Sequence, residues 1–242
     1  MKIGIIGAMA EEVDLLRKRL EPAIPESIAD TTFHSGVMDE IEVVVLQSGI
    51  GKVNAAIGTT MLIQHYQPDY VINTGCAGGF HPDLRVGDVV ISTEVRHHDV
   101  DATIFNYEYG QVPRMPAFYL PDPELVAIAE AAARTLPDLK VYQGLIASGD
   151  SFMSDDDRVA FVKSKFEHLY AVEMEAASIA QVCNRFKTPF VVIRSISDIA
   201  GGEAKMSYEQ FMGLAAVRSE QIVLSMLGQL KERQNQGVGT HA

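Results

Sequence analysis

The chain has 242 residues, of which 47% are hydrophobic and 21% are charged, a composition that argues against an intrinsically disordered protein. Its 32 acidic and 20 basic residues give a formal net charge of −12. Nucleic acid and anionic membrane surfaces both attract basic residues, so neither is an expected partner. The sequence contains no run of 18 apolar residues, so we expect no membrane-spanning segment.

The two cysteines, Cys76 and Cys183, are not part of a C-x-x-C pair, which argues against a disulfide scaffold or a cysteine-rich zinc module. Free thiols fit a reducing compartment. The N-terminus does not resemble a signal peptide, because its apolar stretch already ends at Glu11 and a helical pattern follows. We therefore expect a cytoplasmic protein.

Short apolar runs alternate with helical patterns along the chain. Strands are expected at residues 2–6, 42–47, 70–73, 88–95, 142–147 and 190–194. Helices are expected at residues 9–20, 52–65, 122–135, 155–166, 176–186 and 208–233, the last one broken in its early part. Most of the strands are rich in Val and Ile without alternation, which is typical of strands covered on both faces. The alternation predicts an α/β domain with a largely parallel sheet.

Residues 96–121 form a long segment with aromatic residues and prolines but no clear period. Loops of this length in a compact domain are usually functional or contact another subunit. The segment begins with the run HHDVD at 97–101. Adjacent histidines on an extended backbone point in opposite directions, so a structural or subunit-contact role is favoured over a shared metal ion.

Small or polar residues follow five of the expected strands, in the runs 7–12, 48–52, 74–79, 148–152 and 195–198. Ligands of open α/β folds bind past the carboxyl ends of the strands, which suggests that these turns form one pocket. The glycine-rich turn at 75–79 could let a ligand approach the backbone closely, although a plain tight turn is the alternative. Neither a dinucleotide fingerprint nor a phosphate loop fits the first two runs.

Candidate catalytic carboxylates occur at three places along the chain. Glu12 lies about 60° from the centre of the apolar stripe of its helix, whereas Glu11 is on the far side. Glu173 and Glu175 precede an alanine-rich apolar stripe, and Asp198 ends an apolar run. Helix-start and helix-capping roles are the alternatives for all of them. Carboxylates gathered at one sheet edge suggest acid–base chemistry, in which one protonates a leaving group and another activates water.

Eight segments occur in one order: MKIGIIGAM–EEV, QSGIGKVNAA, INTGCAGG, VGDVVIS, DATIFNYEYGQVP, GLIASGDSF, AVEMEA and PFVVIRSISD. Together they resemble the bacterial 5′-methylthioadenosine/S-adenosylhomocysteine nucleosidases of the purine nucleoside phosphorylase superfamily, from residue 1 to about residue 230. The resemblance implies a three-layer α/β/α catalytic domain with a central mixed, largely parallel sheet over residues 1–233. Residues 234–242 are mostly polar and are expected to form a tail. The resemblance also implies a homodimer without metal or organic cofactor, active in methionine salvage.

The reaction implied by the resemblance is hydrolysis of the N-glycosidic bond of 5′-methylthioadenosine and S-adenosylhomocysteine, with 5′-deoxyadenosine as a third candidate. Glu12 matches the glutamate that activates the attacking water, and Asp198 matches the aspartate that protonates adenine N7. Glu175 matches the carboxylate that binds the ribose hydroxyls. The other implied substrate-binding residues are Gly78, Phe152, Met153, Met174, Met9, Ile50, Cys76, Ser197 and Tyr208, with Phe105 and Pro113 lent by a neighbouring subunit to the 5′-thio pocket.

Four positions depart from the pattern of these nucleosidases. Cys76 stands where many relatives have Ser, Tyr208 where Phe is common, Met153 where Ile is usual, and Ala10 where Glu is usual. These differences concern the preference for the 5′-substituent rather than the reaction.

Two alternative functions remain. A phosphate-dependent purine nucleoside phosphorylase would need basic groups or helix N-termini beside ribose C1′, whereas a carboxylate such as Glu12 should repel phosphate. A non-catalytic nucleoside-binding domain on the same fold is the second alternative, and the loss of Glu12 or Asp198 would be its mark. Both carboxylates are present.

Overall fold

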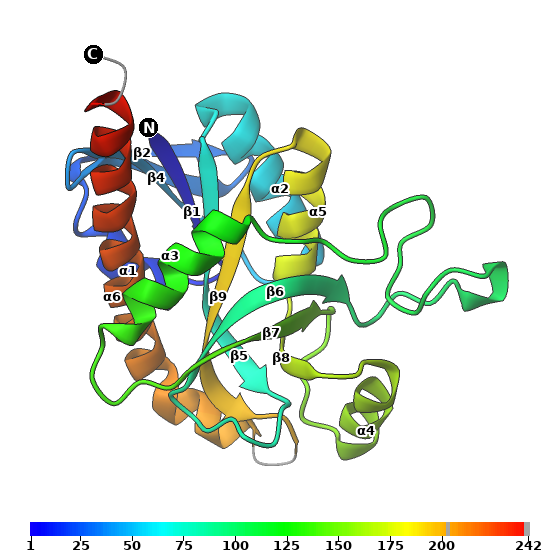
Figure 1. Ribbon diagram of the computed structural model, residues 1–242. Coiled ribbons are helices and arrows are strands. Elements are labelled where there is room, and N and C mark those ends of the chain that lie inside the picture. Colours follow the sequence, from blue (N-terminus) through cyan, green and yellow to red (C-terminus); the bar gives the residue numbers. More distant parts are fainter. Residues whose placement is uncertain (202–203, 240–242) are drawn as a thin grey trace.

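One mixed sheet organises the computed structural model, which describes residues 1–201 and 204–239 (Figure 1). Its nine strands lie in the order β2-β3-β4-β1-β5-β8-β7-β6-β9, and β9 also pairs with β5, so that β5, β8, β7, β6 and β9 close on themselves. Five pairings are parallel and four are antiparallel. The strands are β1 (Lys2–Gly7), β2 (Glu21–Ile28), β3 (Thr31–Met38), β4 (Ile41–Gln47), β5 (Tyr70–Gly79), β6 (Val89–His97), β7 (Val141–Ser148), β8 (Leu169–Glu173) and β9 (Phe190–Ile199).

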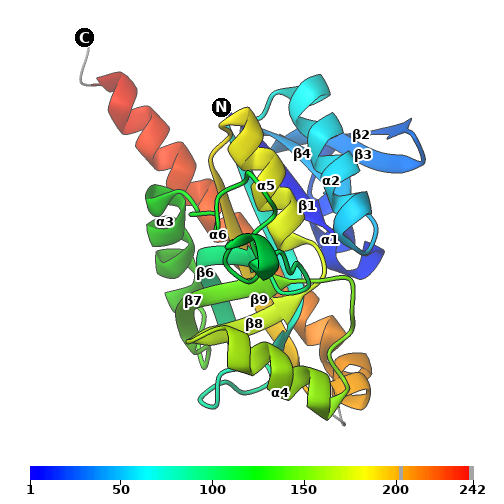
Figure 2. The same ribbon diagram turned by 90° about the vertical axis from the view of Figure 1, so that its right-hand side faces the viewer.

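Helices cover both faces of the sheet and complete three layers (Figures 1 and 2). Helices α1, α3 and α6 pack together on one face, and α2 packs against α5 on the other. The three-layer arrangement with a mixed sheet confirms the expected fold. The helices are α1 (Ala10–Arg17), α2 (Lys52–Met61), α3 (Pro123–Arg134), α4 (Asp156–Lys165), α5 (Ala176–Phe186), α6 (Ala204–Gly239) and the short turns η1 (Leu62–Tyr66) and η2 (Thr103–Phe105).

The central strands are buried on both faces, as their unbroken apolar runs predict. In β1, Ile3 and Ile5 belong to the core beneath α1, α3 and α6, whereas Ile6 belongs to the core beneath α2 and α5. Successive side chains of a strand point to opposite faces, so each apolar residue of β1 has a helix layer to pack against. Packing by helices on both faces holds the central strands in place, and the candidate site is built at the ends of these strands.

Three strands are absent from the predicted elements. β2 is exposed over nearly its whole length and contains Pro22 and Pro25, so it has neither the burial pattern nor the composition of an inner strand. It is an edge strand, where proline is tolerated. β3 pairs with it, and β8 is only five residues long, too short for a periodic signal.

Three elements extend several residues beyond their predicted ends. β5 continues through the glycine-rich run to Gly79, and β9 continues to Ile199, so the expected turn at 75–79 is wrong: those glycines lie in a strand. Helix α6 extends from Ala204 to Gly239 as one element, so the predicted early break is also wrong. The last three positions of the predicted tail, 240–242, lie outside the described residues.

The segment between β6 and α3 projects from the body of the domain (the green loops at the right of Figure 1). It contains η2, and Ile104 and Phe105 there are 85% and 74% exposed. Within residues 1–201 and 204–239, no helix is long and apolar enough to cross a membrane.

Candidate active site

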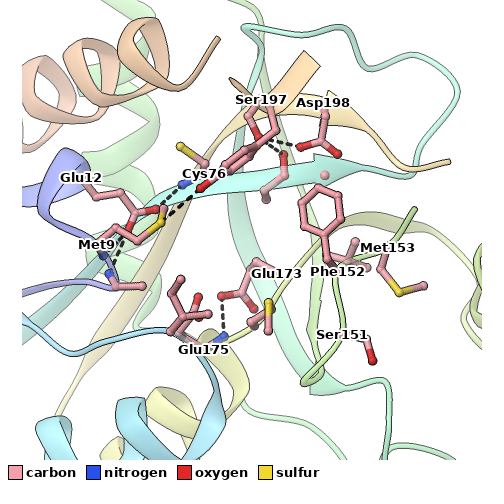
Figure 3. Close-up of a pocket in the computed structure, with 17 residues that line it drawn as sticks. Met9, Glu12, Cys76, Ser151, Phe152, Met153, Glu173, Glu175, Ser197 and Asp198 are labelled. Atoms are coloured by element: carbon pink, nitrogen blue, oxygen red, sulfur yellow. Dashed lines mark hydrogen bonds between the residues drawn. The ribbon is translucent and has the colours of Figure 1, made fainter. Parts of the chain in front are cut away.

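A cavity of about 270 Å³ lies past the carboxyl ends of five strands (Figure 3). All five runs of small or polar residues contribute to its wall, among them Met9, Ile50, Cys76, Phe152 and Asp198. The expectation of one shared pocket is therefore confirmed. The volume is close to the lower end of the range for small-molecule sites, which suits a ligand of nucleoside size.

Nearly every residue that the resemblance assigned to the site lines this cavity. The exceptions are Phe105 and Pro113, which are exposed on the projecting segment and do not reach the pocket of their own chain. Residues to which sequence analysis assigned no individual role also line it, including Ala8, Ser151 and Val172. They are small or apolar residues beside the predicted ones and carry no signal of their own.

Glu12 is buried in the first turn of α1, where its carboxylate accepts three backbone hydrogen bonds. The donors are Ala8 N at 2.7 Å and Met9 N at 3.1 Å to one oxygen, and Cys76 N at 3.0 Å to the other. The helix-start role that the sequence left open is therefore real, because Glu12 caps its own helix. Burial raises the pKa of Glu12, while the charge of Arg194 and the three N–H donors oppose that rise. The result is a fixed carboxylate that faces the cavity and is more basic than an exposed one.

Gly75 explains how the backbone of β5 comes so close to Glu12. Its φ is +154°, and a Cβ at this position would lie 2.5 Å from Glu12 Oε1 and 2.8 Å from Arg194 Nη1. A side chain would therefore displace both charged groups, so the close approach requires glycine. The glycine-rich run therefore belongs to a strand whose backbone lies against the Glu12 carboxylate, and it does not form the predicted turn.

Asp198 is buried near the end of β9, on a different side of the cavity from Glu12 (Figure 3). Ser197 Oγ donates to Asp198 Oδ1 at 2.7 Å. Gly78 of β5 lies beside it, where a Cβ would fall 3.1 Å from Asp198 Oδ2. Burial raises the pKa of Asp198, and the hydrogen bond from Ser197 opposes the rise. The protonated form of this carboxyl, which can donate to a ligand, is therefore more favoured here than it would be in solvent.

The variant Ser197→Ala is expected to extend activity to higher pH. The hydroxyl of Ser197 lowers the pKa of Asp198, so removing it should raise that pKa further. If protonated Asp198 is the active form, activity is lost as the pH rises through its pKa, and the falling limb of the kcat/KM profile should move upward in the variant. A falling limb that stays in place or moves to lower pH would contradict this assignment.

Glu175 precedes α5, with its carboxylate against the turn that follows β4. Gly51 N donates to Glu175 Oε1 at 2.8 Å, and the side chain is largely buried at the cavity wall. Burial and the neighbouring carboxylate of Glu173 raise the pKa of Glu175 to about 8. This carboxyl can accept hydrogen bonds from the hydroxyls of a ligand when it is ionised.

A buried ion pair at the edge of the cavity was not predicted. Arg194 Nη2 donates to Glu173 Oε2 at 2.6 Å and to Asn73 Oδ1 at 2.7 Å, and both charged side chains are almost fully buried. Removing one partner of a buried pair leaves an uncompensated charge, so the two residues depend on each other. The sequence signal was a single charge, Arg194, inside the apolar run VVIRSIS.

One part of the cavity wall is rich in sulfur. Tyr208 Oη donates to Met9 Sδ at 3.1 Å, and Cys76 Sγ lies 3.6 Å from Met212 Sδ. Burial and the nearby carboxylate of Glu12 raise the pKa of Cys76, so the thiol stays neutral. Two of the four departures from the nucleosidase pattern, Cys76 and Tyr208, therefore lie in the same weakly polar part of the cavity wall.

The remaining predicted contacts form apolar walls. Phe152 is 44% exposed and packs edge-on against Tyr208, with ring centroids 5.9 Å apart. Met153 is buried behind it, and Met174 lies between the two glutamates of its run at the cavity wall. An aromatic ring beside flexible methionine side chains is suited to a flat heterocycle.

The run at 97–101 has a structural role. Both of its histidines are buried, and Asp99 accepts hydrogen bonds from Lys52 Nζ at 2.6 Å and from Asp150 N at 3.0 Å. Asp99 thereby ties together two of the pocket turns. Across the described part of the chain, no three His, Cys, Asp or Glu side chains are grouped so that they could hold a metal ion.

This fold and pocket define an α/β protein of the nucleoside phosphorylase type, and a family model described as "Phosphorylase superfamily" matches residues 2–228. A 5′-methylthioadenosine/S-adenosylhomocysteine nucleosidase of Bacillus pumilus is 59% identical over 229 residues, which are 95% of this chain and 99% of the relative.

Two solved structures of similar proteins contain ligands. The nucleosidase of Colwellia psychrerythraea, in complex with adenine, superposes with a TM-score of 0.93 at 52% identity, covering 95% of this chain and 96% of that one. The nucleosidase of Neisseria meningitidis, in complex with methylthio-immucillin-A, gives 0.91 at 45% identity, with coverage of 93% and 98%. Within the superfamily, the chain belongs to the family of 5′-methylthioadenosine/S-adenosylhomocysteine nucleosidases.

Proposed function

We propose that the protein hydrolyses the N-glycosidic bond of 5′-methylthioadenosine and S-adenosylhomocysteine, releasing adenine and the corresponding 5-substituted ribose. The observation that carries this proposal is a nucleoside-sized cavity with two buried carboxyl groups on different sides, Glu12 and Asp198. Their surroundings differ as the two halves of an acid–base reaction require. The similar nucleosidases support the choice of substrates.

In this mechanism Asp198 acts as the general acid. Adenine is a poor leaving group as an anion, whereas protonation of its N7 lets it leave as a neutral molecule. The ribose then takes on oxocarbenium character at C1′. The raised pKa of Asp198 supports this role, since burial favours the protonated form that a general acid requires.

Glu12 is the general base that takes a proton from the attacking water. Its three backbone N–H donors hold the carboxylate in one orientation, and its raised pKa makes it a stronger base. Water attacks C1′ as the bond to adenine breaks, and the proton passes to Glu12. We assign the ribose hydroxyls to Glu175, the face of the sugar to Met174, and adenine to Phe152 and the backbone of Met153.

A phosphate-dependent reaction is less consistent with this pocket. Phosphate would need cationic groups at the reacting carbon, yet no Lys or Arg side chain of the described residues lines the cavity. The guanidinium of Arg194, which acts on Glu12 through its charge, is already paired with Glu173. The carboxylate of Glu12 would repel an anion at the same place.

We further propose a homodimer in which Phe105 and Pro113 of one chain extend the 5′-substituent pocket of its partner. The exposed apolar side chains of the projecting segment, with Val53 and Ile57 of α2, support a second copy as the occupant. Light scattering should then give twice the mass of one chain, and Phe105→Ala should raise KM for 5′-methylthioadenosine. A monomer with full activity would contradict this arrangement. The two free thiols support a reducing, cytoplasmic location.

The substrate assignment is tested by incubating the protein with 5′-methylthioadenosine, S-adenosylhomocysteine or 5′-deoxyadenosine and measuring released adenine by chromatography. We expect release from the first two. Tight binding of either nucleoside without release would instead indicate a binding domain, and neither binding nor release would refute the assignment.

A further inference from the structure

Glu173 lines the cavity, yet the proposed reaction gives it no task. It is the first carboxylate of the run Glu-Met-Glu, and its side chain is only 3% exposed. One carboxylate oxygen accepts from Glu175 N at 3.0 Å, from Ala176 N at 2.8 Å and from Arg194 Nη2 at 2.6 Å. The other accepts from the hydroxyl of Ser148. Both oxygens of this carboxylate are thus already bound by donors of the protein itself.

These contacts attach the start of α5 to the sheet. Two of the donors, Glu175 N and Ala176 N, are backbone amides at the start of α5. The first amides of any helix have no hydrogen-bond acceptor within that helix. A third amide, Ala177 N, donates to Ser148 Oγ at 2.7 Å, and Ser148 in turn donates to Glu173. Glu173 therefore fixes the position of Glu175, because the carboxylate of Glu173 accepts a hydrogen bond from the backbone N–H of Glu175 (Figure 3).

Glu173 also acts on Glu175 through its charge. Burial alone would raise the pKa of Glu173, but the charge of Arg194 and the hydrogen bonds from Ser148 and Ala176 hold it below its ordinary value. Glu173 is thus an anion beside Glu175. The other charged groups that face Glu175 are Arg194 on β9, which favours its ionisation, and Glu12 on α1, which opposes it.

We propose that Glu173 is a positioning residue for Glu175: its buried carboxylate binds the first amides of α5 and places a negative charge beside the carboxyl group that meets a ribose-bearing ligand. This inference rests on the proposed function, in which Glu175 accepts hydrogen bonds from the ribose hydroxyls. Binding would then shift Glu175 to its carboxylate form, and the displaced proton would pass to the solvent.

The test measures protons released when a ligand binds, by titration calorimetry at pH 7 in buffers of different ionisation enthalpy. The probe is 5′-methylthiotubercidin, whose base has carbon in place of N7 and so leaves the N7 contact with Asp198 out of the measurement. The wild-type protein should release most of one proton per ligand. In Glu173→Gln the release should fall by at least half, because Glu175 loses its anionic neighbour and ionises before the ligand arrives.

Glu173→Asp is the matched control, because the shorter side chain keeps the negative charge but moves the carboxylate away from the amides at the start of α5. It should release as many protons as the wild type but bind the probe at least several-fold more weakly. Equal proton release by the Gln variant and the wild type would overturn the inference. If the Gln variant does not fold, the Asp variant is sufficient for the test: wild-type affinity for the probe in that variant would overturn the inference.

Failure of the proposed function gives a different result. Adenine release by the wild-type protein is measured first, and its absence would refute the proposed reaction whatever the Glu173 variants do. With an active wild type, an unchanged proton release in the Gln variant refutes only the role of Glu173.

Discussion

Asp198→Asn is expected to lower kcat for 5′-methylthioadenosine about 10³-fold, a typical loss when a general acid is removed. The amide cannot protonate N7, yet it has nearly the same shape as the buried carboxyl and can still accept from Ser197 Oγ. Binding of a non-reacting analogue should therefore change little. Single-turnover rates and calorimetric affinity measured on the same preparation check both parts of this expectation.

The control for this variant is Asp157→Asn, which makes the same chemical change on the exposed first turn of α4. It should have wild-type kinetics. If Asp198→Asn keeps near-normal turnover, Asp198 is not the acid. If it loses affinity and turnover in parallel, its role is in binding rather than in proton transfer.

Glu12→Gln is expected to lower hydrolysis at least about 100-fold, since the amide cannot take a proton from water. Glu12 also accepts three backbone N–H groups, and the amide keeps only one accepting oxygen. At least one buried N–H is then left unpaired, which should cost about 1–3 kcal/mol of unfolding free energy. The hydrolysis rate reports the loss of the general base, whereas thermal unfolding reports the loss of the hydrogen bonds that Glu12 accepts at the start of α1.

Glu11→Gln is the matched control for Glu12→Gln. Glu11 is the neighbouring residue of the same helical turn but is exposed, so its variant should keep wild-type activity and stability. A Glu12→Gln protein that still hydrolyses its substrate rapidly would mean that another group activates the water.

The sequence was sufficient to predict the pocket because each run of small or polar residues follows a strongly apolar run. Residues such as Ile3 and Ile5 pack against helices on one face while Ile6 packs on the other, so these strands and the ends from which the pocket is built were visible in the pattern. The orientation of Glu12 followed from helical periodicity in the same way. The roles assigned to Glu12, Glu175 and Asp198 came from the resemblance to known nucleosidases, and they remain predictions.

What the sequence did not predict depends on contacts between distant segments. Arg194 and Glu173 lie 21 positions apart on different strands, and their pairing exists only because β9 and β8 both lie beside β5. β2 was missed because an exposed edge strand with two prolines has no apolar signal to detect. Gly75 was assigned to a turn because a strand that runs through such a glycine-rich segment is uncommon.

The most direct test of hydrolysis by this pocket is adenine release from 5′-methylthioadenosine in phosphate-free buffer, repeated with added phosphate, with the sugar product identified by mass. We predict equal rates under both conditions and free methylthioribose as the product. Release that requires phosphate and yields the sugar 1-phosphate would contradict the account, because Glu12 would then not be the group that activates water.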